Sequence, residues 1–146
     1  MRLSSRGCYA LAALAEMAID NAGEPIAVAA LALRLQISKI YLEQVFSILK
    51  KSGLVVSTKG AQGGYTLAKT PNNITVYDIL LPIESALFEG SEKSVENIPP
   101  ESKLAVTKLV FHPLDKAVEE TLKAVTLAEL ASEVRNKRLS GSMYYI

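Results

Sequence analysis

A glycine-rich turn between two alternating segments is the feature that most restricts the fold of this 146-residue chain. The segments LVVSTKG (54–60) and GYTLAK (64–69) alternate apolar and polar residues, and glycines occupy positions 60, 63 and 64. Alternation of this kind predicts strands, and a short glycine-containing connection between two such runs predicts a β-hairpin. The predicted hairpin has a flexible tip with one cationic side chain, Lys59.

Three helices are predicted before the hairpin. Apolar residues recur at helical spacing over 5–20, a shorter helical segment covers 28–35, and Ser38 is placed to cap a third helix that ends before Gly53. In the third helix a buried stripe is expected from Leu42, Val45, Phe46 and Leu49, with polar residues on the outward arc. Three helices followed by a hairpin is the order of a winged helix-turn-helix domain.

The remaining sequence contains further helix signals. Thr75-x-x-Asp78 resembles a capping box for a helix near 76–85, which Pro82 should kink or shorten. Residues 86–103 are rich in Glu, Ser and Pro and are expected to form an exposed loop. Pro113 suits the first turn of a helix to about residue 124, with His112 as its cap, and Thr126-x-x-Glu129 is a capping box for another helix. The expected fold class is mostly α with a small β-hairpin.

A winged helix-turn-helix suggests binding to double-stranded DNA. The third helix would enter the major groove, and the narrow hairpin tip would enter or border the minor groove, where glycine permits close backbone approach. Glutamine can pair with adenine, and a glutamate can accept a hydrogen bond from cytosine. DNA repels a carboxylate that makes no such contact, so Glu43 either discriminates between bases or is turned aside. The candidate DNA-binding residues are Arg2, Arg6, Ser38, Lys39, Tyr41, Glu43, Gln44, Lys50, Lys59, Gly60, Gln62 and Gly63.

The charge distribution agrees with this interpretation. Residues 1–69 contain 8 Lys/Arg and 4 Asp/Glu, a net +4, whereas residues 70–146 contain 8 and 11, a net −3. A basic first half favours contact with nucleic acid, and an acidic second half favours a protein partner, although a split this small also arises by chance.

Other functions are disfavoured by residue content. One cysteine and one histidine offer neither a zinc site nor a good nucleophile and base pair, so we expect no metal and no enzyme. No stretch approaches the roughly 20 apolar residues needed to cross a membrane, and no signal peptide is evident. We therefore expect a cytoplasmic protein without contact to membranes.

Three segments resemble the Rrf2 family of winged-helix regulators. They are MRLSSRGCYAL (1–11), ISKIYLEQVFSILKKSGLV (37–55) and VSTKGAQGGYTLAKTPNNITVYDIL (56–80), and AVTLAEL (124–130) is similar to a later segment of the family. The resemblance implies a homodimeric regulator, which we expect to be a repressor. Its long C-terminal helix would cross to the other subunit, and its two recognition helices would meet a palindromic operator. It divides the chain into a DNA-binding domain (1–85), an exposed loop and connector (86–110), and dimerisation helices with a tail (111–146).

The cysteine content points to a subgroup of that family. Cluster-binding members hold an iron–sulfur cluster with three cysteines in the loop that corresponds to residues 86–110, where this chain has none. Lys108 stands at the position of the cluster's histidine, so no cofactor is expected. The sequence is more similar to the cluster-free, CymR-like repressors of cysteine metabolism, and this likeness implies cysteine synthase (O-acetylserine thiol-lyase) as a partner.

The last residues suggest how that enzyme would be bound. Tyr144, Tyr145 and Ile146 resemble the end of the CymR-like repressors and would dock as a peptide through an apolar side chain and a carboxylate. The alternative is that these residues pack on the dimer or fray.

Two further alternatives remain open at the level of sequence. Cys8 is either a redox sensor or a small apolar side chain of the first helix. The winged fold itself could serve a protein-interaction adaptor that does not bind DNA. Changes at Lys39, Gln44 or Lys59 distinguish these functions, because only a DNA-binding protein should lose DNA affinity when they are replaced.

Overall fold

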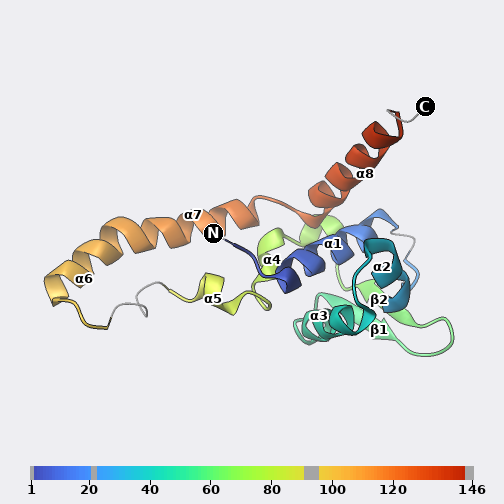
Figure 1. Cartoon of the computed structure of the whole chain (residues 1–146), viewed down its shortest axis with the longest axis horizontal. Coiled ribbons are helices and arrows are strands. Elements are labelled where there is room, and N and C mark those ends of the chain that lie inside the picture. The colour runs from blue at the N-terminus through green and yellow to red at the C-terminus, as the bar shows by residue number, and fades with distance from the viewer. Residues whose placement is uncertain (1, 21–22, 91–95, 144–146) are drawn as a thin grey trace.

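The computed structural model describes residues 2–20, 23–90 and 96–143, which form a body of packed helices and one long helical arm (Figure 1). The body contains α1 (Ser5–Ile19), α2 (Val28–Leu35), α3 (Lys39–Lys51), β1 (Val55–Thr58), β2 (Gly64–Leu67), the 3₁₀ turn η1 (Pro71–Asn73), α4 (Val76–Leu80) and α8 (Leu127–Met143). After α5 (Ser85–Phe88), the arm is formed by α6 (Pro100–Val106), the π-helical stretch η3 (Thr107–Phe111) and α7 (His112–Lys123). The expected fold class, mostly α with a β-hairpin, is confirmed.

The first helix is fixed at its N-terminus by local and distant contacts. The Ser4 hydroxyl accepts a hydrogen bond from the Gly7 N–H at 3.2 Å and donates to the Glu84 carboxylate at 2.6 Å. A side chain at Gly7 would collide with that carboxylate and with Leu80. Glycine at this position therefore lets α1 pack closely against the end of α4.

The helix-turn-helix connection follows the predicted pattern. α2 ends at Gln36, which adopts a left-handed conformation with φ 55°, and the Ile37 N–H then donates to the Ala32 carbonyl at 3.0 Å. Ser38 caps α3 by accepting a hydrogen bond from the Tyr41 N–H at 3.4 Å. The short connection thus sets α3 at an angle to α2, with its N-terminus at the surface.

The hairpin is antiparallel and is anchored to the body on two sides. Val55 pairs with Leu67 and Thr58 with Gly64. Ile26, which precedes α2, exchanges two backbone hydrogen bonds of 2.9 Å with Tyr65. The centroids of the Tyr65 ring and of the Phe46 ring on α3 also lie 4.9 Å apart, so the wing is held in a fixed position relative to that helix.

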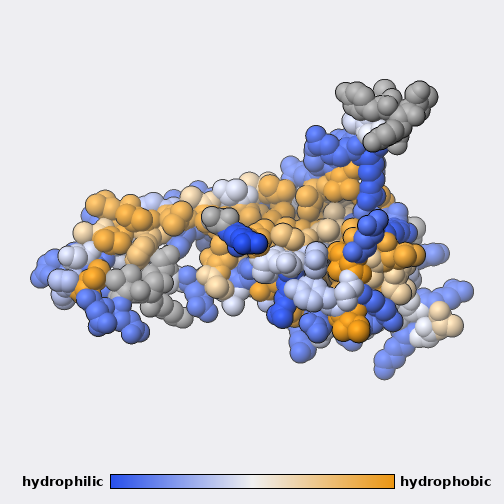
Figure 2. All heavy atoms as spheres, in the orientation of Figure 1, coloured by the Kyte–Doolittle hydropathy of each residue, from blue (hydrophilic) through white to orange (hydrophobic). Residues whose placement is uncertain are grey.

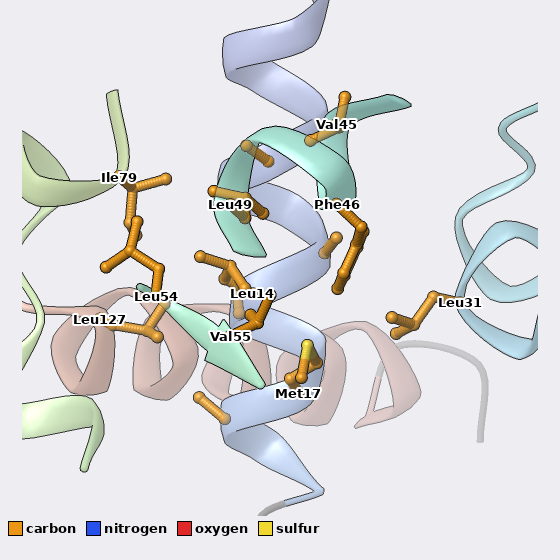
Figure 3. Close-up of a cluster of buried hydrophobic side chains, with 14 of the residues drawn as sticks. Leu14, Met17, Leu31, Val45, Phe46, Leu49, Leu54, Val55, Ile79 and Leu127 are labelled. Carbon is orange, nitrogen blue, oxygen red and sulfur yellow. The ribbon is translucent and has the colours of Figure 1, made fainter. Parts of the chain in front are cut away.

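The core lies between α1, α3, β1, α4 and α8 (Figure 3). The predicted stripe of α3 is buried here, and α8 contributes Leu127 and Ala131. One carboxylate is also enclosed: Glu16 of α1 is 3% exposed and is ion-paired with Arg138 of α8 and, at 3.9 Å, with Arg34 of α2. Arg34 pairs in addition with Asp20. These charges connect α8 to the helix-turn-helix.

The second half differs from the prediction in two places. α4 ends at Leu80, as Pro82 suggested, but α5 and the start of α6 occupy part of the predicted loop 86–103, and the rest of the connector up to residue 110 is helical. Pro113 lies in the first turn of α7, which ends at Lys123, as predicted, but His112 is the first residue of that helix and not its cap, because the chain is already helical from Pro100 onward.

The helix continues through this junction because the π-helical stretch η3 ends at Phe111, two residues before Pro113. Proline lacks an N–H and its ring collides with the carbonyl four residues earlier, and the wider turn of a π-helix relieves both problems without ending the helix.

Among the described residues, no helix is both long and apolar enough to cross a membrane.

Candidate nucleic-acid interface

The outward face of α3 carries polar and charged groups at the surface of the body. Lys39, Glu43, Gln44 and Lys50 are all exposed, and Ser38 at the N-cap is exposed as well. In Figure 1 this helix and the hairpin lie along the same lower side of the body. A groove-binding helix with an adjacent wing requires this arrangement.

Glu43 is engaged by a neighbour on its own helix. Its carboxylate lies 3.6 Å from the Lys39 ammonium, an i,i+4 pair in which both side chains are at least half exposed. Such exposed pairs contribute about 0.3–0.5 kcal/mol, so this one opens at little cost. In the unbound chain the charge of the Glu43 carboxylate is therefore balanced by the Lys39 ammonium, and the carboxylate can still be released to accept a hydrogen bond from a base.

Tyr41 is half-buried rather than fully outward. Its ring meets the Tyr9 ring of α1 edge-on, with centroids 5.4 Å apart and an interplanar angle of 85°. The two tyrosines line a shallow surface hollow together with Ser5, Ile37 and Ser38. The first turns of α1 and α3 thus border the same hollow, and N–H groups at helix N-termini favour a phosphate.

The wing tip depends on glycine for its shape. Gly60 has φ +110°, a conformation that side chains disfavour, and its carbonyl accepts a hydrogen bond from the Gly63 N–H at 3.0 Å. A side chain at Gly63 would collide with the Thr58 carbonyl. The resulting narrow tip exposes Lys59 and Gln62.

The structure brings most of the predicted site residues onto two neighbouring elements, α3 and the wing. Arg2 and Arg6 are exposed at the beginning of the chain and on the first turn of α1. Tyr144, Tyr145 and Ile146 lie outside the described residues. The residue that the sequence prediction did not name is Ile40, a large apolar side chain that is 71% exposed in the first turn of α3.

Three of the four acidic residues in the basic half are ion-paired. Of the four acids within residues 1–69, Glu16 and Asp20 are engaged with Arg34 and Arg138, and Glu43 with Lys39. The hydrogen bond to Glu16, opposed in part by desolvation, raises the pKa of Arg138 above its ordinary value. The contact with Glu16 therefore favours the charged form of Arg138.

Comparison with known proteins identifies relatives over nearly the whole chain. The family model of Rrf2, described as iron-dependent transcriptional regulator, matches residues 3–133. The transcriptional regulator IscR of Erwinia tasmaniensis is 33% identical over 132 residues, which are 90% of this chain and 79% of that protein. IscR of Photobacterium profundum is 31% identical over 141 residues, 97% of this chain and 81% of that protein.

Solved structures give the same result. CymR (YrzC) of B. subtilis, described as its global cysteine regulator, superposes with a TM-score of 0.76 at 32% identity, covering 91% of this chain and 98% of that one. IscR of T. potens superposes with a TM-score of 0.72 at 34% identity, covering 92% and 88%. The oxidised form of Staphylococcus aureus CymR gives 0.70 at 30% identity, covering 90% and 96%.

Proposed function

Because the chain belongs to the Rrf2 family of DNA-binding transcriptional regulators, we propose that it is a homodimeric repressor that occupies a palindromic operator. A member of this family is a regulator and not an enzyme. The observation that carries the proposal is the exposed polar face of α3 beside the glycine-dependent wing. A promoter-binding protein works where the chromosome is, so we propose a cytoplasmic location.

Within this function each predicted residue has a role. Gln44 and Glu43 read base edges in the major groove, and Tyr41 holds the start of α3 against α1. Lys59, Gly60, Gln62 and Gly63 follow the minor groove. Phosphates are held by Ser38, Lys39, Lys50, Arg2 and Arg6, because backbone contacts fix the register in which bases are read.

Dimerisation is proposed to use the arm. Leu104 and Leu109 are 70% and 72% exposed, and Leu114, Ala117, Val118, Thr121 and Leu122 line a shallow apolar groove on α7. Figure 2 shows hydrophobic residues gathered on the arm as well as on the body. We propose residues 1–85 as the DNA-binding part and the region 111–146 as its dimerisation part, with α8 also bracing the body through α1.

We propose that this regulator works without an iron–sulfur cluster, although its family model is described as iron-dependent. The chain has a single cysteine and a single histidine. Cys8 is exposed on α1 and His112 begins α7, and within the described residues no three metal-binding side chains form a group. Thiolates are the ordinary ligands of these clusters, so the donor set does not fit one.

The signal is proposed to be a partner enzyme of cysteine metabolism. The likeness to CymR of B. subtilis supports this assignment, as does the resemblance of SMYYI to the tail of CymR-like proteins. In this proposal Tyr144, Tyr145 and Ile146 dock into cysteine synthase. The bound enzyme then favours one spacing of the two recognition helices over another.

A selection experiment tests the function and its circuit separately. The purified protein is mixed with sheared genomic DNA of its source, with and without its cysteine synthase, and retained fragments are sequenced. A short palindrome upstream of sulfur-uptake or cysteine genes, enriched further by the enzyme, is the expected result. A palindrome elsewhere would remove the cysteine assignment, and no enrichment would leave the adaptor function.

Variants of the interface make the same test quantitative. Gln44→Ala should weaken binding to the selected palindrome and relax selectivity at one position, whereas Lys59→Ala should weaken binding to all DNA. Affinity should also fall steeply with salt, because each phosphate contact releases counterions. Affinity indifferent to salt and to both substitutions would contradict DNA reading by α3 and the wing.

A further inference from the structure

Ile40 lies in the first turn of α3, on the outward face of the helix. The other large apolar residues in the first three turns of this helix face inward: Leu42, Val45, Phe46 and Leu49 are each 0% exposed, and Tyr41 and Ile48 are partly buried. With 3.6 residues per turn, Ile40 points almost directly away from that buried stripe and lies on one ridge with Gln44 and Ser47. Its exposure of 71% follows from this position.

The position of Ile40 is more informative than its exposure. Single exposed apolar residues are normal on protein surfaces, and Leu33 of α2 is 81% exposed. Ile40, however, is the second residue of a helix whose N-terminal residues meet base edges in the helix-turn-helix mode. It is also absent from the apolar residues that pack on the core, so the fold makes no use of its side chain.

We propose that Ile40 is a specificity-determining residue that contacts the C5-methyl group of a thymine in the major groove. An isoleucine side chain has no hydrogen-bond donor or acceptor, so it cannot satisfy the polar atoms of a base edge. The thymine methyl is the apolar group that the major groove presents. This inference rests on the proposed role of α3 as the recognition helix.

The neighbours of Ile40 locate that thymine within the operator. Glu43 and Gln44 follow about one turn later on the same face, about 4.5 and 6 Å along the helix axis. Base pairs stack about 3.4 Å apart. The thymine read by Ile40 should therefore lie within about two base pairs of the position that depends on Gln44.

The test changes the DNA duplex and measures how tightly the protein binds it. Wild-type protein selects its preferred sites from a random double-stranded DNA library, and Kd is then measured by fluorescence anisotropy at one fixed salt concentration. Each thymine of the selected site is replaced in turn by deoxyuridine, which differs only by lacking the methyl group. The same series is measured with Ile40→Ala and with the control Leu33→Ala, both surface substitutions that leave the core intact.

The expected result is one uracil-sensitive position in each half-site. Losing one buried methyl contact should weaken wild-type binding about fourfold per substituted half-site. Leu33→Ala should keep this sensitivity, and Ile40→Ala should bind the thymine and uracil duplexes equally, close to the wild-type affinity for the uracil duplex.

Two outcomes would overturn the inference, and they are distinguishable. If wild-type protein selects a sequence but no thymine is sensitive to uracil, or if Ile40→Ala keeps the sensitivity, Ile40 does not read the methyl and the proposed function survives. If wild-type protein selects no sequence, the role of α3 fails and the inference fails with it.

Discussion

The winged-helix body and the arm use apolar residues in opposite ways. In the body, Leu14, Phe46 and Leu127 are completely buried by residues from α1, α3 and α8. In the arm from Pro100 to Lys123, the buried residue among those described is Thr107, while Leu104, Leu109 and Leu114 are exposed. The C-terminal end of the arm contacts the body, where the Lys123 ammonium lies 4.7 Å from the centre of the Tyr77 ring on α4.

The difference separates what one chain can do alone from what needs a second surface. The body encloses its own core, so its fold is determined within the chain. The arm has helical hydrogen bonds but no internal core, and most helical stability in proteins comes from packing of an apolar face. A second copy that covers the apolar stripe would stabilise the arm and place two recognition helices on one DNA, which is the dimer proposed above.

The largest effect is expected from opening the core of the body. Phe46→Ala removes a fully buried ring that packs on Tyr65 and holds the wing against α3. The substitution should lower the free energy of unfolding by about 3–5 kcal/mol in urea titrations. Ile40→Ala, on the exposed side of the same helix, is the matched control and should change stability by less than about 0.5 kcal/mol.

A charge in the arm should act on association rather than on folding of the body. Leu114→Glu places a carboxylate in the apolar groove of α7, and symmetry places it there twice in a dimer. The dimer dissociation constant, measured by sedimentation equilibrium, should rise at least about 100-fold. Lys116→Glu, a charge change on the polar side of α7, should have little effect. Equal behaviour of the two variants would place the interface elsewhere.

The charge contact between α1 and α8 should have an intermediate effect. Arg138→Ala leaves the buried Glu16 carboxylate with Arg34 at 3.9 Å as its remaining ion-pair partner. Loss of about 1–3 kcal/mol of stability is expected, because a buried acceptor loses its strongest donor. Arg135→Ala removes an exposed arginine one turn earlier and is the control. If both variants unfold alike, the Glu16 contact does not join α8 to the body.

The smallest effect is expected at the junction between arm and body. Thr126 caps α8 by accepting from the Glu129 N–H at 3.2 Å, and Thr126→Ala should cost about 1 kcal/mol. Hydrogen bonds from the Thr126 backbone N–H and hydroxyl lower the pKa of Glu129. The ionised Glu129 carboxylate therefore stabilises the fold above the ordinary glutamate pKa, and this stabilisation is lost as pH falls through the lowered pKa.

The pH dependence can be isolated with one further variant. Glu129→Gln should remove this part of the acid-induced loss of stability, which is measured as the unfolding midpoint in urea from pH 7 down to pH 3. A difference between wild type and variant that does not shrink toward acid pH would contradict the capping role of Glu129.

Local signals explain which parts of the fold could be predicted from sequence. Ser38, Thr75 and Thr126 cap helices as their spacing indicated, and the glycines of the hairpin tip form the predicted turn. Pro113 lies in the first turn of α7 as predicted, but no local signal indicated that a π-helical stretch would continue the helix N-terminal to it. The Glu16–Arg138 contact joins residues 122 positions apart, which no local pattern reveals.

The exposure of the candidate residues on α3 could be predicted in outline and less well in detail. The polar residues of α3 are exposed as expected, but Tyr41 is half-buried against Tyr9 because α1 and α3 cross there. Ile40 was overlooked because an apolar residue is ordinarily assigned to the core. Helical periodicity alone would have found it, since it lies opposite the Leu42, Val45, Phe46 and Leu49 stripe.

Hydroxyl-radical footprinting on the selected operator tests most directly whether the body reads DNA and the arm joins two copies of the chain. Wild-type protein should protect two symmetric half-sites whose centres lie about 34 Å, or a multiple of that distance, apart. Leu114→Glu should remain folded but lose the paired protection at the same protein concentration. A single protected half-site for the wild type, or an unchanged symmetric footprint for Leu114→Glu, would contradict an arm that joins two DNA-reading bodies.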